Sequence, residues 1–128
     1  MTAWGGGRWS SGAAVTNVLA RFSAMRYNMK MAIRSYGDAG TRDIAAGINS
    51  KPARRTLPVE LHELARRRLA FLAAAGSLDD LGARPRLNLH ALKRNRVGQQ
   101  AIRINDKYRI CFVWSAGDAA GVEITDYH

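Results

Sequence analysis

The spacing of apolar residues changes once along this chain, from the period of a helix to the period of a strand. Between Pro58 and Ala75, leucine and alanine recur at intervals of three and four residues, which predicts a helix with one buried face. Past Gly82, apolar and polar residues alternate instead, as is typical of strands that bury one side. The pattern therefore predicts helices followed by a sheet.

Short strand-like runs supply the sheet, and polar segments separate them. Asn105, Asp106 and Lys107 are predicted to form a turn, and residues 115–121 a longer loop. The predicted strands are Ala32–Tyr36, Leu87–Leu89, Ala101–Asn105, Tyr108–Trp114 and Val122–His128.

Two shorter segments complete the helical part. Asp38 is predicted to cap a brief helix that Gly47 ends, and Ser77 is predicted to cap a single turn after the long helix. Residues 48–56 are predicted to be a basic loop. Together the elements indicate an α+β fold, with two helices packed on one face of a small, mostly antiparallel sheet.

The chain of 128 residues has the length of one domain. Residues 1–28 begin with glycine- and serine-rich sequence, and regular patterning starts only after them. We expect residues 1–28 to be an N-terminal extension, flexible or a mis-assigned start, and residues 29–128 to be the functional domain. No apolar run approaches the roughly 18 residues of a membrane span, and the single cysteine, Cys111, is predicted to be buried, so we expect a cytoplasmic protein.

Charge narrows the possible functions. Twenty Lys and Arg residues oppose ten Asp and Glu residues, which gives a formal net charge of +10 that attracts polyanions. A high arginine content also arises from genome composition, so the charge supports nucleic-acid binding without establishing it. The arginines of the long helix, Arg66 to Arg68, are predicted to form a solvated face, with Glu63 and Arg67 as one ion pair.

The strongest basic cluster lies in the sheet region. Only Asp106 opposes it, and such an imbalance is costly unless a polyanion or an acidic partner neutralises it. A solvated basic face is the alternative interpretation. The members of the cluster are Arg84, Arg86, Lys93, Arg94, Arg96, Arg103, Lys107 and Arg109.

Histidines near these cations suggest RNA cleavage. His90 and Lys93 share one segment, and His128 ends the last predicted strand, from which it could approach Arg109. A proton acceptor for the 2′-hydroxyl, cations for the charged phosphorane and a proton donor for the 5′-oxygen suffice for cleavage without a metal. Few carboxylates and one cysteine leave no metal-site pattern and no cofactor motif, and His62 is predicted to be structural.

Four segments in fixed order resemble the HigB-like killer toxins of the RelE/ParE superfamily: RRRLAFLAAAGSLDDL, LHALK, GQQAIRINDKYRICFVW and VEITDYH. The resemblance implies a RelE-like α+β fold and a type II toxin that cleaves mRNA on the ribosome and so inhibits translation and growth. It also implies a HigA-like helix-turn-helix antitoxin that represses the shared operon. The toxin would then contact DNA only indirectly, through this antitoxin.

By position, the resemblance assigns His90, Lys93, Arg109 and His128 to catalysis. Lys93 and Arg109 would bind phosphate, the two histidines would transfer protons or orient groups, and Tyr127 could stack a base. We expect RNA binding at Arg94, Arg96, Arg103, Lys107 and Tyr127.

Two other functions are compatible with the same sequence features. A ParE-like gyrase poison on the same fold would act through protein binding, without a catalytic set. A noncatalytic basic RNA-binding module would bind RNA without cutting it, although aromatic residues, at 8%, are few for a stacking surface.

Overall fold

A single antiparallel sheet carries the residues that matter for function. In the computed structural model, which describes residues 33–126, four strands lie in the order β2-β3-β4-β5. Residues 1–32 and 127–128, including the predicted extension, Tyr127 and His128, lie outside the described range. The strands are β2 (His90–Ala91), β3 (Gln100–Arg103), β4 (Tyr108–Ser115) and β5 (Asp118–Asp126).

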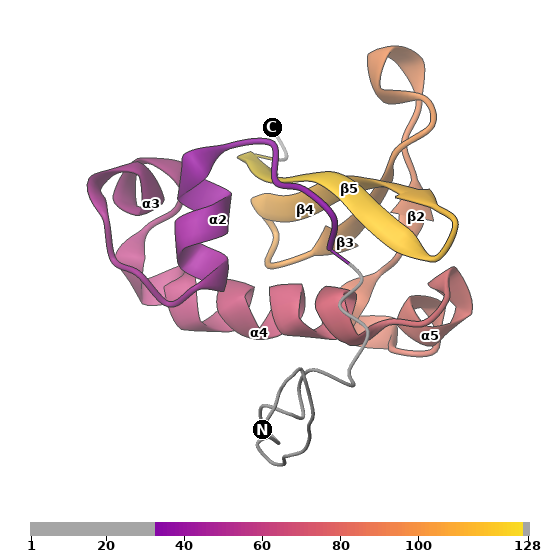
Figure 1. Cartoon of the computed structure of the whole chain (residues 1–128), viewed down its shortest axis with the longest axis horizontal. Coiled ribbons are helices and arrows are strands. Elements are labelled where there is room, and N and C mark those ends of the chain that lie inside the picture. The colour runs from indigo at the N-terminus through magenta and orange to yellow at the C-terminus, as the bar shows by residue number, and fades with distance from the viewer. Residues whose placement is uncertain (1–32, 127–128) are drawn as a thin grey trace, which may run out of the picture. The chain divides into compact units, whose positions relative to one another are not determined.

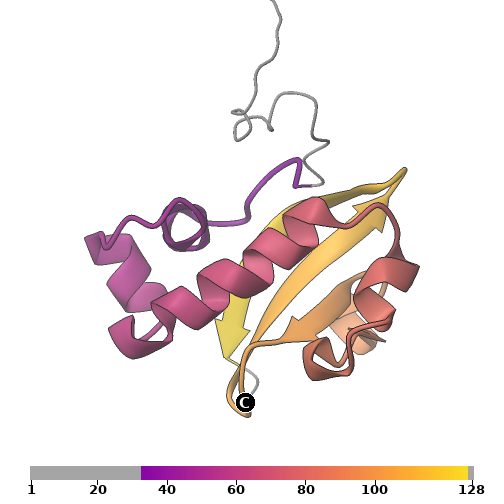
Figure 2. The same cartoon turned by 90° about the horizontal axis from the view of Figure 1, so that it is seen from below.

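Helices cover one face of this sheet, as Figures 1 and 2 show. The longest, α4, lies across the strands, with α2 and α3 toward one of its ends and α5 beyond the other (Figure 2). Their bounds are α2 (Ala39–Ala45), α3 (Lys51–Thr56), α4 (His62–Ala74) and α5 (Leu78–Gly82), with short 3₁₀ turns η1 (Val59–Leu61), η2 (Pro85–Leu87) and η3 (Arg94–Arg96). The predicted α+β architecture, with helices packed on one face of an antiparallel sheet, is confirmed.

The core lies between α4 and the sheet. Ala65, Leu69 and Leu72 of α4 are buried, as the helical spacing predicted. The strand residues packed in the same core are Ile102, Ile104, Ile110, Phe112, Val122 and Ile124. Because successive strand residues point to opposite faces, the residues between them point away from α4.

Side-chain caps explain where the helices begin. The Asp38 carboxylate accepts a hydrogen bond from the Thr41 amide at 2.6 Å, and the Ser77 hydroxyl accepts one from the Asp80 amide at 3.3 Å. Both predicted caps are confirmed.

The predicted basic loop at residues 48–56 is wrong, because it contains α3. The Ser50 hydroxyl accepts a hydrogen bond from the Ala53 amide at 3.2 Å, and Pro52 lies in the first turn. These are helix-start signals that the charge of the segment obscured. Gly40 lets α2 approach α3, since a Cβ there would lie 1.9 Å from the Thr56 hydroxyl oxygen.

Two predicted strand boundaries are also wrong, each for a local reason. Residues 87–89 do not form a strand, because Pro85 starts a 3₁₀ turn and Asn88 adopts a left-handed conformation with φ 47°. The predicted loop at 115–121 is a tight turn at Ala116 and Gly117, both with positive φ, as type I′ hairpins require, so β5 starts at Asp118.

The first predicted strand is reduced to isolated bridges. Ile33 and Tyr36 pair in parallel with Ala119 and Val122 of β5. Between those two partners β5 contains Gly121 with φ 61°, opposite an irregularity in the β4–β5 register, which interrupts a regular ladder.

The predicted pairing of Glu63 with Arg67 is confirmed only as an attraction between charges; the direct contact is with Arg66. Glu63 accepts two hydrogen bonds from Arg66, at 2.9 and 2.5 Å, and this interaction lowers the pKa of the Glu63 carboxyl, with a smaller contribution from the charge of Arg67. A spacing of three residues suits the helix as well as one of four. His62 is structural, since its Nε2 lies 2.8 Å from the Leu57 carbonyl oxygen.

Thr41 links α2 to the sheet through the buried end of its side chain. Its hydroxyl accepts a hydrogen bond from the Ile124 amide at 3.0 Å, and the residue is fully buried.

Thr41→Val keeps the shape of the side chain and leaves this buried amide without its acceptor. We therefore expect the free energy of unfolding, measured by urea denaturation, to fall by about 1–3 kcal/mol. Thr41→Ser, which keeps the acceptor, should lose less; equal losses would contradict the assigned role.

Candidate active site

A pocket of about 160 Å³ opens beside the turn between β3 and β4. It combines one histidine and two arginines with polar groups of the turn. Its lining residues are Asn88, His90, Arg103, Asn105, Asp106, Tyr108 and Arg109.

The strand register explains why the three basic side chains meet. His90 pairs with Ala101, and Arg103 pairs with Arg109. Directly paired residues share a face, and so do residues two apart on one strand. His90, Arg103 and Arg109 therefore project from the sheet face that points away from α4.

A hydrogen-bonded turn fixes this register. The Asn105 side-chain oxygen accepts hydrogen bonds from the amides of Lys107 and Tyr108, at 2.9 and 2.8 Å. This arrangement is typical of an asparagine that stabilises a turn through its own side chain. It holds Arg103 and Arg109 opposite each other at the adjoining ends of β3 and β4.

The two arginines are electrostatically costly neighbours. Like charges directly opposite on paired strands destabilise a sheet. Asp106 forms an ion pair with Arg103 and offsets part of this repulsion, although its side chain is almost fully exposed. An anion bound in the pocket would offset more, because guanidinium groups match the geometry of phosphate oxygens.

The ring of His90 has a defined hydrogen-bond partner. Its Nδ1 lies 2.8 Å from the carbonyl oxygen of Asn88, whose left-handed backbone presents that oxygen. A carbonyl only accepts hydrogen bonds, so Nδ1 is the donor. The neutral ring then carries its free electron pair on Nε2, which can accept a proton.

The remaining predicted site residues of the described range do not line the pocket. Lys93, Arg94 and Arg96 lie in the segment between β2 and β3, which projects beyond the sheet (Figure 1, orange). Arg96 donates to the Gln99 side chain at 2.9 Å and lies 3.6 Å from the Glu123 carboxylate. Lys107 lies 3.8 Å from the Asp126 carboxylate. Tyr127 and His128 are outside the described residues.

Sequence reasoning missed the neutral members of the pocket. Asn88 and Asn105 act through backbone geometry, and Tyr108 contributes a half-buried ring. An asparagine lies shortly before β2 and before β4, and this residue type favours turns and left-handed conformations. That pattern could have indicated Asn88 and Asn105.

Cys111, possible metal ligands and possible membrane-spanning helices were also considered in the sequence, and residues 33–126 bear on each of them. Cys111 is fully buried, as predicted, and packs with Leu92 and Ala101 on the outer face of the sheet. Within residues 33–126, no three His, Cys, Asp or Glu side chains are grouped so that they could hold a metal ion. In the same range, no helix has the length and apolar character needed to cross a membrane.

Comparison with known families identifies the fold. A family described as the RelE-like toxin of type II toxin-antitoxin system HigB matches residues 48–128, which is more than half of the chain and includes α4, the sheet and the whole pocket. A comparison with curated proteins gave no significant match. On the strength of the family match and the RelE-like sheet, this chain belongs to the HigB-like toxins of type II toxin-antitoxin systems.

Proposed function

We propose that this toxin is a ribosome-dependent mRNA endoribonuclease that inhibits translation and growth. The observation that carries the proposal is the meeting of His90, Arg103 and Arg109 in one small pocket. A protein-binding poison would not require a histidine with a defined tautomer beside two paired guanidinium groups. Phosphoryl transfer at a ribose hydroxyl can use both, the histidine for proton transfer and the guanidinium groups for the developing charge.

The proposed reaction uses the message's own 2′-hydroxyl. His90 Nε2 takes the proton of this hydroxyl, and the oxygen attacks the adjacent phosphorus. Arg103 and Arg109 stabilise the extra negative charge on the phosphorane oxygens. The P–O5′ bond then breaks, which leaves a 2′,3′-cyclic phosphate on one fragment and a 5′-hydroxyl on the other. No metal or cofactor takes part in this scheme.

A second proton carrier completes the scheme. His128 follows Asp126 by two residues, and Asp126 pairs with Tyr108, which lines the pocket. We assign His128 to protonation of the leaving 5′-oxygen. Its position in the sequence, near the pocket end of β5, is the support for this role.

The residues around the pocket would hold the RNA. Lys93 contributes a phosphate contact in the catalytic set, and Arg94, Arg96 and Lys107 bind the backbone on either side. Tyr127 would stack a base. The net charge of +10 would draw the toxin to the ribosome.

Family membership implies an antitoxin partner. We propose that it is a HigA-like helix-turn-helix protein, which would bind the operator and connect the toxin to DNA indirectly. Because the proposed substrate is translated message, the toxin would act in the cytoplasm.

The tautomer of His90 provides a first test. In the neutral ring we expect the Nδ1–H form to dominate, because the Asn88 carbonyl accepts that proton. Long-range ¹H–¹⁵N NMR distinguishes the two tautomers, and His90→Gln identifies the resonances. A dominant Nε2–H form would remove the proposed base.

The activity itself is tested with translating ribosomes. We expect Arg109→Ala to lower the rate of message cleavage by about 100-fold or more, the usual cost of losing a preorganised group that stabilises transition-state charge. His90→Ala should have an effect of about 100- to 10,000-fold. Arg55→Ala, which removes an exposed arginine of α3, is the matched control and should retain activity.

Unfolding measurements on each variant separate loss of chemistry from loss of fold. Full activity in folded Arg109→Ala and His90→Ala would place the reaction elsewhere. Intact message accompanied by DNA damage in cells would favour a gyrase poison, and binding without any cut would favour a noncatalytic RNA-binding module.

A further inference from the structure

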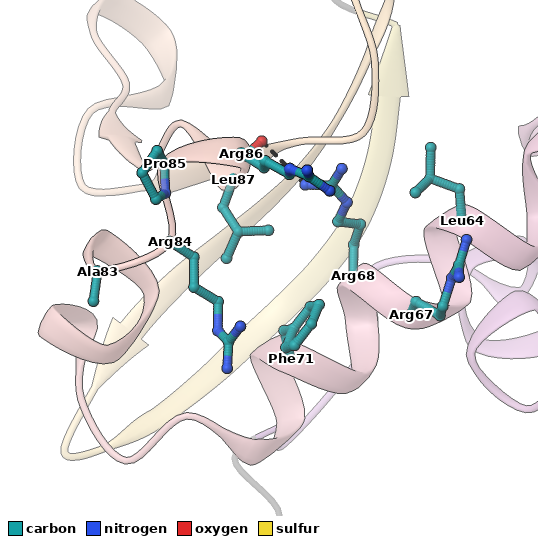
Figure 3. A pocket seen from close by; sticks show the side chains of 9 residues that line it. All are labelled: Leu64, Arg67, Arg68, Phe71, Ala83, Arg84, Pro85, Arg86 and Leu87. Carbon is teal, nitrogen blue, oxygen red and sulfur yellow. Dashed lines mark hydrogen bonds between the residues drawn. The ribbon is translucent and has the colours of Figure 1, made fainter.

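A second cationic hollow, which we call the arginine groove, lies between α4 and the segment that follows α5 (Figure 3). It measures about 550 Å³, more than three times the volume of the candidate active site. Its lining residues are Leu64, Arg67, Arg68, Phe71, Ala83, Arg84, Pro85, Arg86 and Leu87.

The charge of the arginine groove has one sign. Four of its lining residues are arginines and none is acidic. Glu63, the acid nearest in sequence on α4, forms its ion pair with Arg66, and its charge also acts on Arg67 without a direct contact. The pKa of the Arg68 guanidinium is lowered by burial and by the charges of Arg103, Arg86 and Arg67. The cations therefore repel one another in the absence of an anion.

Two of the guanidinium groups are held in place. Arg68 Nη1 donates a hydrogen bond to the Arg86 carbonyl oxygen at 3.0 Å (Figure 3). The Arg84 guanidinium lies over the ring of Phe71, 4.3 Å from its centroid. Arg67 and Arg86 project exposed side chains from the two walls. A ligand would thus meet cations that are partly ordered in advance, which lowers the entropic cost of binding.

The groove and the candidate active site are joined by one short stretch of chain. Arg84 to Leu87 form one wall of the groove, and the next residues, Asn88 and His90, line the catalytic pocket. Arg103 strengthens the link, because it lines the pocket while its charge acts on Arg68. The groove and the pocket are therefore adjacent along the chain, and arginines of the two sites are close enough to act on each other through their charges.

We propose that the arginine groove binds the phosphate backbone of single-stranded RNA that flanks the segment in the catalytic pocket. The inference rests on the proposed endoribonuclease function and extends it by a second RNA-binding site on the helical side of the molecule. Arginine forks suit phosphate oxygens. RNA is favoured over an acidic peptide because the groove wall runs directly into the chain segment that lines the proposed RNA-cleaving pocket. The apolar floor of Leu64, Phe71 and Leu87 leaves room for a base beside the backbone.

The test measures binding of a fluorescent single-stranded RNA of about 12 nucleotides with 2′-O-methyl groups, which prevent cleavage. The full-length toxin is compared with the double variant Arg67→Gln, Arg86→Gln. We expect this variant to bind at least about tenfold more weakly, which corresponds to about 1.4 kcal/mol, because it loses two cations that face the phosphates. The slope of log K against log salt should fall by roughly 0.7 for each lost contact.

The matched control is the double variant Arg42→Gln, Arg55→Gln. It removes the same charge from exposed positions on α2 and α3, which Figures 1 and 2 place toward the other end of α4 from α5. We expect this control to bind RNA nearly as well as the wild type. Equal weakening of both double variants, or no binding by the wild type, would overturn the groove proposal.

The outcomes separate this inference from the proposed function. If the wild type cleaves message on ribosomes but the groove variant binds RNA normally, the groove proposal alone fails. If Arg67→Gln, Arg86→Gln keeps RNA affinity and loses affinity for the antitoxin, the groove is a protein-docking surface and the RNA proposal is wrong. If the RNA binds through the groove but no message is cut, the endoribonuclease proposal fails instead.

Discussion

The register between β3 and β4 is the constraint on which the rest of the structure depends. Asn105 closes the turn between these strands, and the pairing of Ile102 with Ile110 and of Arg103 with Arg109 follows from it. The isoleucines then face α4 and enter the core, while the arginines face outward. A shift by one residue would exchange the two sets. Stability and the candidate chemistry are thus fixed by the same hydrogen-bonded ladder.

The apolar contacts on the α4 side of the sheet allow like charges to stand close together on its outer face. The arginine pair would repel the two strands if the apolar contacts behind it did not hold them together. Acidic side chains offset part of the repulsion between the cations. Asp106 pairs with Arg103 at the pocket, and Glu63 pairs with Arg66 on α4. The lining of the arginine groove, in contrast, contains four arginines and no acidic residue. The distribution of acids therefore helps to determine where an anion can bind.

Much of the fold could be predicted from the sequence, because long periodic patterns average over local exceptions. The stripe of α4 and the strands β3 and β4 are confirmed for this reason. Short elements were harder to predict, because one or two residues decide them. Ser50 and Pro52 start α3 within a basic segment, and the left-handed Asn88 replaces a predicted strand.

The candidate site was predictable only in part. Alternation along neighbouring strands indicates that Arg103 and Arg109 share a face, and family resemblance indicates His90. The contribution of Asn88 depends on its backbone conformation, and the groove depends on the approach of α4 to the chain after α5. Neither is visible in residue spacing, because both arise from contacts between distant segments or from a single unusual dihedral angle. Tyr127 and His128 remain predictions.

The proposed mechanism holds that RNA is cut in the pocket containing His90, Arg103 and Arg109, where the 2′-hydroxyl of the RNA attacks the adjacent phosphorus. The most direct measurement is the chemistry of the cut ends on a ribosome-bound message, compared with the same message carrying a single 2′-deoxy nucleotide at the cleavage position. The account predicts a 2′,3′-cyclic phosphate and a 5′-hydroxyl from the natural message, and no cut at the substituted position. Cleavage of the 2′-deoxy message, or products with a 5′-phosphate, would contradict it.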